Sequence, residues 1–96
     1  MSDNSELEIT NLNTIDSGKL NEIVHIRGIV REHSDFDGGI KVLIEQEGYR
    51  MKVVYFTRIE EEFNIKNGMC VDVLGDVQTY KNSMEIIAKE IVFFIC

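Results

Sequence analysis

The sequence predicts a small all-β barrel of five strands, with one short helix between the third and fourth strands. Five segments alternate apolar and polar side chains with the two-residue period of half-buried strands, whereas residues 57–66 have a helical spacing. Glycines lie in the middle of two of these segments, where a strand must bend. Five twisted strands in so short a chain best avoid bare edges by closing into a barrel, with the helix plugging one end.

Length and composition fit one domain. The 96 residues, 44% of them hydrophobic, suffice for a single core. We expect residues 1–8 to form a flexible N-terminus and residues 9–96 to form the domain. The net charge of −7 argues against coating nucleic acid by bulk charge but is compatible with a local basic patch. Because no segment has the pattern of a secretory leader or a membrane span, we expect a cytoplasmic (intracellular) protein with no membrane partner.

The residues that most often bind metals or catalyse reactions do not form a recognisable pattern. Cys70 and Cys96 lie in apolar, strand-like segments without the spacing of metal ligands, so we expect reduced, buried thiols and neither a zinc site nor a disulfide. His25 and His33 lie on different segments without a nucleophile or carboxylate beside them. We therefore predict no metal, no cofactor and no catalytic residues, and hence a protein that is not an enzyme.

The first strand is predicted over residues 24–31. Val24, Ile26 and Val30 face one side of it, together with Gly28. A glycine in mid-strand allows a sharp bend or a bulge where the strand passes from one sheet to another. Residues 32–39 are polar apart from Phe36, which predicts a mobile loop that presents one aromatic ring.

The second and third strands are predicted to form a hairpin over residues 38–56, with a tight turn at Glu47-Gly48. This turn places the apolar side chains of the two strands opposite one another on one face, which should belong to the core. The other face mixes cations with apolar and aromatic groups, a combination suited to a polyanion that has flat bases. Its members are Lys41, Leu43, Arg50, Lys52, Val54 and Phe56.

The rest of the chain predicts one helix and two strands. Thr57 precedes Glu60 as in a capping box, and the acidic residues 60–62 would form the solvated face of a short helix over residues 57–66. Residues 69–79 form a fourth strand, and residues 80–83 a turn. Residues 84–94 form a fifth strand, in which a change of phase at residues 89–90 indicates a bulge.

Three runs in this order resemble the oligonucleotide/oligosaccharide-binding fold (OB-fold) of transfer-RNA synthetase anticodon domains, replication protein A and exonuclease VII. They are VHIRGIV, GGIKVLIEQEGYRMKVVYF and NIKNGMCVDVLGDVQTYKNSMEIIAKEI, and the resemblance spans residues 9–91. It implies a five-stranded Greek-key barrel. It also implies that single strands bind across the second and third strands, between the loop joining strands one and two and the loop joining strands four and five.

The resemblance thus implies a non-catalytic module that binds single-stranded DNA or RNA and has no small-molecule substrate. Carried over by position, it adds Phe36 from the first loop and Tyr80 and Lys81 from the second, and Arg27 and Arg31 could extend the patch along the first strand. The residues expected to contact nucleic acid are Arg27, Arg31, Phe36, Lys41, Leu43, Arg50, Lys52, Val54, Phe56, Tyr80 and Lys81.

Alternative interpretations remain for several of these residues. Arg50 and Lys52 could be ordinary surface cations, with Arg50 pairing across the strands to Glu45. Phe56 could be a stacking platform or part of the core under the helix. The tail at residues 91–96 is too apolar to end free in solvent, so it is either a packed last strand or an interface. The alternative function is accordingly a protein-interaction subunit of a larger nucleic-acid-processing complex.

Overall fold

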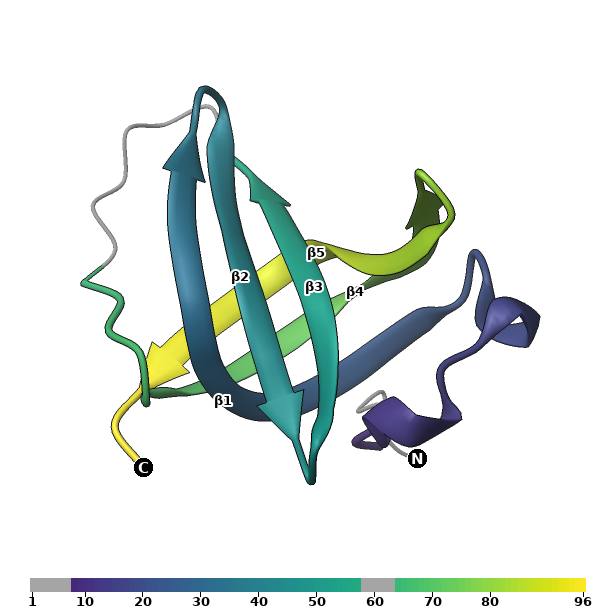
Figure 1. Ribbon diagram of the computed structural model, residues 1–96, viewed down its shortest axis with the longest axis horizontal. Coiled ribbons are helices and arrows are strands. Elements are labelled where there is room, and N and C mark those ends of the chain that lie inside the picture. Colours follow the sequence, from purple (N-terminus) through teal and green to yellow (C-terminus); the bar gives the residue numbers. More distant parts are fainter. Residues whose placement is uncertain (1–7, 58–63) are drawn as a thin grey trace, which may run out of the picture.

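The structure, a computed structural model, describes residues 8–57 and 64–96 and contains a closed five-stranded barrel with the strand order β1-β2-β3-β5-β4 (Figure 1). The predicted all-β barrel is confirmed. The predicted helix of residues 57–66 falls mainly on residues 58–63, which lie outside the described residues. Two short 3-10 turns, η1 and η2, precede the barrel. The elements are η1 (Leu12–Thr14), η2 (Ser17–Lys19), β1 (Ile23–Phe36), β2 (Gly39–Gln46), β3 (Tyr49–Phe56), β4 (Cys70–Tyr80) and β5 (Ser83–Phe94).

Strand β1 takes part in both halves of the barrel. Residues 23–29 pair with β4 and residues 29–36 pair with β2, both antiparallel, and Figure 1 shows the sharp curve between the two halves. Gly28 lies at this changeover, where an added Cβ would meet the side chain of Ile44 and the backbone of Glu45. The register with β2 shifts between Val30 and Glu32. The predicted bend and bulge are therefore confirmed.

The expectation of a mobile loop over residues 32–39 is wrong. Glu32 to Phe36 continue β1 and pair with β2 down to Gly39, so that only Asp37 and Gly38 form the turn. Residues 31–35 are exposed, which explains the missing apolar alternation in the sequence. Backbone hydrogen bonds to β2 hold this segment in the sheet without any buried side chain of its own.

The β2–β3 hairpin has the predicted register. Ile44 lies opposite Met51 and Val42 opposite Val53, and both pairs are buried in the core. The chain reverses at Glu47 and Gly48, whose φ angles of 49° and 84° are positive, as a tight hairpin turn requires.

Strands β4 and β5 complete the barrel. Their register shifts between Leu74 and Gly75, so that Lys89 is the extra residue of β5 and the predicted bulge is confirmed. The hairpin between them turns at Lys81 and Asn82, which have φ angles of 51° and 65°. Strand β5 closes the barrel by parallel pairing of residues 85–87 with residues 52–54 of β3.

Within the described ranges, no helix is long and apolar enough to span a membrane.

The core fills the inside of the barrel with aliphatic side chains from all five strands. Leu12 from η1 joins them, and its backbone N–H donates to the side-chain oxygen of Gln46 at 2.9 Å. Because protein cores are close-packed, a change of one methylene in such a core is costly. The fully buried side chains are Ile26, Val30, Val42, Ile44, Val53, Val71, Val73, Val77 and Ile86.

The expectation of reduced thiols is wrong, because Cys70 and Cys96 form a disulfide with a Cα–Cα distance of 5.5 Å. Cys70 begins β4 and lies opposite Phe94, near the end of β5. The two sulfur atoms meet because β5 returns alongside β4 and brings the last residue back beside the first residue of β4. The disulfide closes a loop with a sequence separation of 26 residues.

Candidate nucleic-acid interface

The outward side chains of β2 and β3 form a surface that we call the β2–β3 face. It comprises Lys41, Leu43 and Glu45 from β2 and Arg50, Lys52, Val54 and Phe56 from β3. Side chains alternate along each strand, so burial of Val42, Ile44, Met51 and Val53 in the core directs these neighbours outward. The β1–β2 turn and the β4–β5 turn flank this face.

An aromatic pair lies at the β1–β2 turn. The rings of Phe36 and Phe56 meet edge to face, with a centroid distance of 5.8 Å and an interplanar angle of 88°. The Nζ of Lys41 lies 5.6 Å from the centre of the Phe36 ring. Phe56 is 60% exposed, which excludes the interpretation of this ring as core. The Phe56 ring is thus available to solvent, and the neighbouring Phe36 ring has the ammonium of Lys41 close to it.

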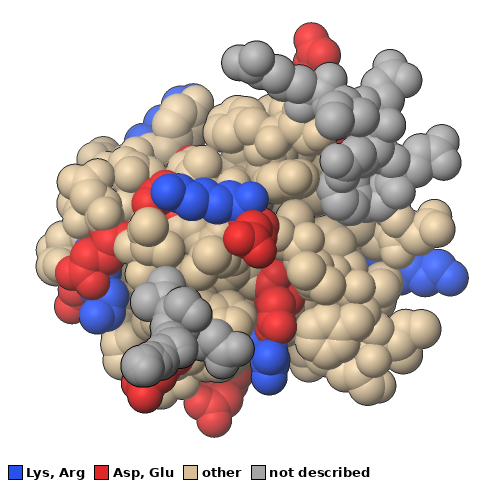
Figure 2. All heavy atoms as spheres, turned by 180° about the vertical axis from the view of Figure 1, so that it is seen from behind, with Lys and Arg blue, Asp and Glu red and all other residues tan. Residues whose placement is uncertain are grey.

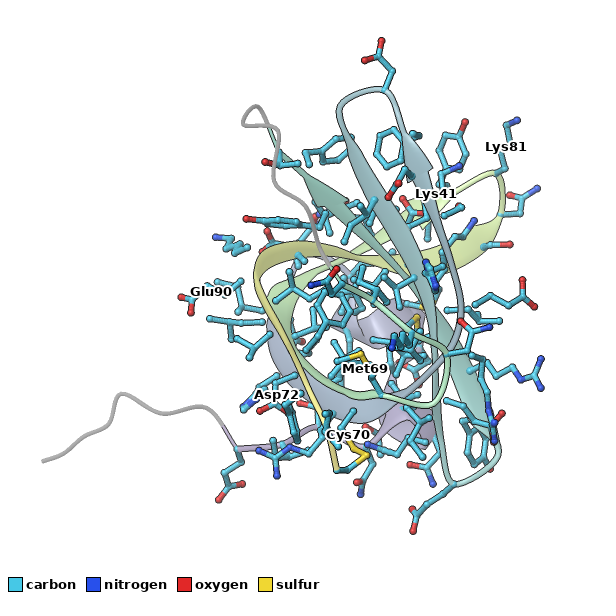
Figure 3. All side chains as sticks on the ribbon, turned by 90° about the vertical axis from the view of Figure 1, so that its left-hand side faces the viewer. Lys41, Met69, Cys70, Asp72, Lys81 and Glu90 are labelled. Atoms are coloured by element: carbon cyan, nitrogen blue, oxygen red, sulfur yellow. A yellow bond between two sulfur atoms is a disulfide. The ribbon has the colours of Figure 1, made fainter. Side chains whose placement is uncertain are left out.

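Tyr80 lies at the β4–β5 turn and is also exposed, at 54%. The Nζ atoms of Lys52 and Lys81 lie 5.9 Å and 5.4 Å from the centre of its ring. Lys52 comes from β3, so this contact connects the β4–β5 turn to the β2–β3 face. Figure 3 shows Lys41 and Lys81 toward the same end of the barrel, away from Cys70. Both turns therefore combine an exposed ring with lysine.

The two arginines of this region share one carboxylate. Arg31, the bulge residue of β1, donates from Nε and Nη2 to both oxygens of Glu45 at 3.0 Å, and Arg50 Nε donates to Oε1 at 3.2 Å. The hydrogen bonds from Arg31, followed by its charge and by Arg50, lower the pKa of Glu45, and the pKa of Arg31 is raised in return. The predicted pairing of Arg50 with Glu45 is confirmed.

Lys52 forms a second contact with an acidic group. Its Nζ lies 3.7 Å from Oε1 of Glu85 on β5, the residue opposite it in the parallel pairing. Glu85 is only 8% exposed, although its side chain points away from the core. In the part of the chain that the structure describes, Lys41 and Lys81 form no ion pair with a carboxylate.

The structure does not bring Arg27 to the β2–β3 face. Its guanidinium donates to both oxygens of Asp72 on β4, from Nε at 2.6 Å and from Nη2 at 3.0 Å. Arg31 pairs with Glu45 instead, so the two arginines have different partners, and their extension of one patch stays a prediction. The hydrogen bonds from Arg27 lower the pKa of Asp72, whose carboxylate also lies 3.9 Å from Nε2 of His25.

Val54 differs from the prediction as well. It is 6% exposed, so the expectation of an exposed valine on this face is wrong. Leu43 is half-buried beside Lys52 and leaves a small apolar area between the two turns. The face therefore offers cations and rings at its ends and less apolar surface in its centre than the sequence indicated.

Paired charges are found elsewhere on the molecule too. On the opposite face, the cations of the described residues that are visible in Figure 2 lie singly, next to acidic groups or among uncharged atoms. Lys89 on β5 is one example, with its Nζ 3.8 Å from Asp76. The net charge of −7 thus arises on a surface where acids outnumber and often contact the bases.

Sequence reasoning missed the second arginine at Glu45 and the burial of Glu85. Glu85 follows Met84 and precedes Ile86 in an alternating segment, which signals an outward side chain. In the sheet it lies between Lys52 of β3 and Gln78 of β4, neighbours that the local sequence does not reveal. The pairing of Arg31 with Glu45 depends on the bulge at Arg31. Gly28 predicted a bend or a bulge in this strand but did not indicate its exact position.

Comparison with solved structures shows the OB-fold. A chain from the structure of a replication protein A heterotrimer bound to ssDNA matches with a TM-score of 0.67 at 19% identity, over 80% of this chain and 60% of that one. The S. pombe Stn1-ten1 complex matches with a TM-score of 0.63 at 19% identity, over 75% and 57%. Aspartyl tRNA synthetase from Entamoeba histolytica matches with a TM-score of 0.80 at 14% identity, over 94% and 22%.

The closed barrel and these similarities identify the chain as an OB-fold domain, as the sequence resemblance predicted. It spans about three fifths of the length of the replication protein A and Stn1-ten1 chains and about one fifth of the synthetase. No protein-family model matches the sequence, and no curated protein matches it.

Proposed function

We propose that this domain is a non-catalytic module that binds single-stranded nucleic acid across the β2–β3 face and the two flanking turns. The observation that carries the proposal is that each of the two flanking turns combines lysine with aromatic rings, one of which is exposed. Phe56 and Tyr80 are 60% and 54% exposed. Lys41 lies over the Phe36 ring that contacts Phe56, and Lys52 and Lys81 lie near the Tyr80 ring.

The proposed mechanism combines stacking with phosphate neutralisation. Bases stack on the exposed faces of Phe56 and Tyr80, which contributes about 1–3 kcal/mol per base. The lysines move from the rings toward the phosphates that follow each base, because their flexible stems allow this at little cost. The arginines are already held by Glu45 and contribute less. The module acts by binding alone, with no cofactor and no chemical step.

The similar structures support this proposal. One belongs to a replication protein A heterotrimer that is bound to ssDNA, and in both this heterotrimer and the Stn1-ten1 complex the matching chain is assembled with other subunits. On the basis of these similar structures we propose that the ligand is single-stranded DNA or RNA. We also propose that the domain works inside the cell, where such ligands occur.

The test is a fluorescence anisotropy titration with labelled single-stranded DNA and RNA of about 12 nucleotides, a length within the range that one OB-fold covers. If three phosphates are neutralised, the logarithm of the affinity falls with the logarithm of salt at a slope of about −2. Replacing Lys52 and Lys81 together by alanine should weaken binding and flatten this slope.

The matched control replaces Lys66 and Lys89, two lysines outside the β2–β3 face and its turns, by alanine. It removes the same charge and should leave the slope of the wild type nearly unchanged. Equal effects of the two double variants would show that net charge, and not this face, governs binding.

A second candidate function is a protein-interaction subunit. Val92, Phe94 and Ile95 of the C-terminal segment are 57%, 36% and 88% exposed, and Ile29 of β1 is 38% exposed. In the register, Phe94 lies opposite Cys70 and Cys70 opposite Ile29, so these apolar groups share the outer surface of β1, β4 and β5. Sedimentation velocity tests this function. If this surface pairs two copies of the chain, the wild type sediments as a dimer and the Val92→Lys variant as a monomer.

A further inference from the structure

Glu85 is the one charged residue that is buried in the described part of the chain, with an exposed fraction of 8%. Its one ion pair with the described residues is to Lys52, and the closest approach of the two groups, 3.7 Å, is too long for a hydrogen bond. A carboxylate has about four lone-pair positions for hydrogen-bond donors. An ionised carboxylate is costly to bury without such donors. A ligand that donates hydrogen bonds to Glu85 would therefore supply what this carboxylate needs.

The position of Glu85 indicates what that ligand is. On the outer surface it lies between Lys52 of β3 and Gln78 of β4, and the ammonium of Lys52 is also 5.9 Å from the centre of the Tyr80 ring. The amide nitrogen of Gln78 already donates to the side chain of Asn21 at 3.2 Å. In the register Tyr80 lies opposite Ser83, two residues before Glu85, so the carboxylate lies on the same side of the β4–β5 hairpin as the ring on which a base is proposed to stack. Among the described residues, none donates a hydrogen bond to this carboxylate.

We propose that Glu85 recognises the Watson–Crick edge of the base that stacks on Tyr80, and that this position prefers guanine. Guanine presents two adjacent donors, N1–H and the N2 amino group, which match the two oxygens of a carboxylate. Cytosine and adenine present one amino group beside a ring nitrogen that repels a carboxylate, and thymine or uracil presents one N–H between two carbonyls. This inference rests on the proposed binding function.

Lys52 has a defined part in this arrangement. In the free protein its ammonium lies between the carboxylate and the ring and balances the charge of Glu85. When guanine donates to Glu85, the lysine turns to the phosphate of the same nucleotide. Both charged groups then gain closer partners than the 3.7 Å contact that they share without ligand.

The first measurement uses the wild-type protein and oligothymidylate of about 12 nucleotides with one central guanine. Competition anisotropy compares it with oligonucleotides that carry inosine, cytosine, adenine or thymine at the same place. Inosine lacks only the N2 amino group. We expect the guanine oligonucleotide to bind about tenfold more tightly than the inosine one, in line with the discrimination of a bidentate contact.

The second measurement repeats the comparison with the Glu85→Gln variant, which preserves the shape of the side chain but replaces one acceptor oxygen with a donor. The advantage of guanine over inosine should fall below about twofold, while oligothymidylate still binds. The control is Asp76→Asn, which changes another ion-paired carboxylate on the barrel surface and should retain the full preference. Thermal unfolding reports whether each variant folds.

The outcomes separate this inference from the function on which it rests. Wild-type protein that binds all five oligonucleotides equally overturns the role of Glu85 and leaves the binding function intact. Wild-type protein that binds none of them overturns both. If Glu85→Gln does not fold, the wild type can still contradict the inference, because equal affinities for the guanine and inosine oligonucleotides would overturn it.

Discussion

The cations on and beside the β2–β3 face occur in two different environments. At the turns, lysines lie over the rings of Phe36 and Tyr80. On the β1 side of the face, Arg31 and Arg50 both donate to Glu45. A lysine near a ring loses little when it moves to a phosphate, whereas an arginine must first leave a carboxylate with which it forms charge-assisted hydrogen bonds. Similar numbers of cations can thus contribute very differently to binding.

This difference explains how an acidic protein could bind a polyanion at all. The net charge of −7 repels nucleic acid, but in physiological salt screening confines that repulsion to separations of about 8–10 Å. Within that range the turns offer stacking surface, which does not depend on charge, together with Lys41 and Lys81, which form no ion pair with a described carboxylate. If the proposed function holds, stacking should provide most of the affinity, and the arginines should contribute less because they pair with Glu45.

The largest effect is expected from removing an exposed ring. Phe56→Ala should lower the affinity for single-stranded DNA by about 2 kcal/mol, or roughly 30-fold, because a stacked base loses its platform. Stability should change little, since Phe56 is 60% exposed. Anisotropy and urea unfolding measure the two quantities. Val92→Ala, an apolar truncation on the far side of the barrel, is the control, and an equal loss of affinity there would contradict a specific role for Phe56.

A smaller effect of opposite sign is expected at the arginines. Glu45→Gln removes the carboxylate that holds Arg31 and Arg50, so both guanidiniums become available to phosphates. At low salt the affinity should rise about tenfold, and the salt slope should become more negative by about 1.4, the value for two added contacts with a single strand.

The salt series that measures the slope for Glu45→Gln also needs a control. Glu47→Gln removes a carboxylate from the β2–β3 turn and should leave the slope unchanged, although both variants alter the net charge equally. A lower affinity of Glu45→Gln would show that the arginines act in binding only while Glu45 orients them.

A single lysine should matter less. Lys41→Gln removes one phosphate contact and leaves Phe36 and Phe56 in place, so the slope should change by about 0.7 and the affinity by about threefold at low salt. The same titration measures both. Lys66→Gln provides the matched control outside the face, and an unchanged slope for Lys41→Gln would remove this lysine from the proposed interface.

The sequence predicted those parts of the fold that depend on local patterns. Alternation and the Glu47-Gly48 turn fixed the whole β2–β3 register, because a one-residue slip would have exposed Val42 and Ile44. Gly28 predicted the bend of β1, because an added Cβ has no room there. Exposed residues 32–35 were missed because backbone pairing holds them in β1 without an apolar pattern.

The features that were missed, in the fold and in the candidate site, depend on contacts between distant segments. The disulfide forms because β5 returns Cys96 to Cys70, a proximity that spacing in the sequence does not reveal. Glu45 was predicted to meet Arg50, its opposite neighbour, but Arg31 reaches it from another strand through a bulge. Exposure of Val54 was predicted from alternation alone, which identifies the outer side of a strand but not what covers it.

The smallest effect concerns the pH dependence of stability and tests the strength of the arginine–carboxylate contact in the absence of ligand. The pKa of Glu45 is lowered in the folded state, first by hydrogen bonds from Arg31. A carboxylate of this kind stabilises the fold at pH values above its unfolded pKa, about 4.3, and the contribution is lost as the pH falls through the lower folded-state pKa. Wild type should therefore resist urea slightly better than Glu45→Gln at pH 7, and this advantage should shrink as the pH falls below about 4. Glu47→Gln should show no such convergence. An advantage of the wild type that persisted at low pH would mean that Glu45 stabilises the barrel by packing, and the arginines would then be less firmly held than the geometry indicates.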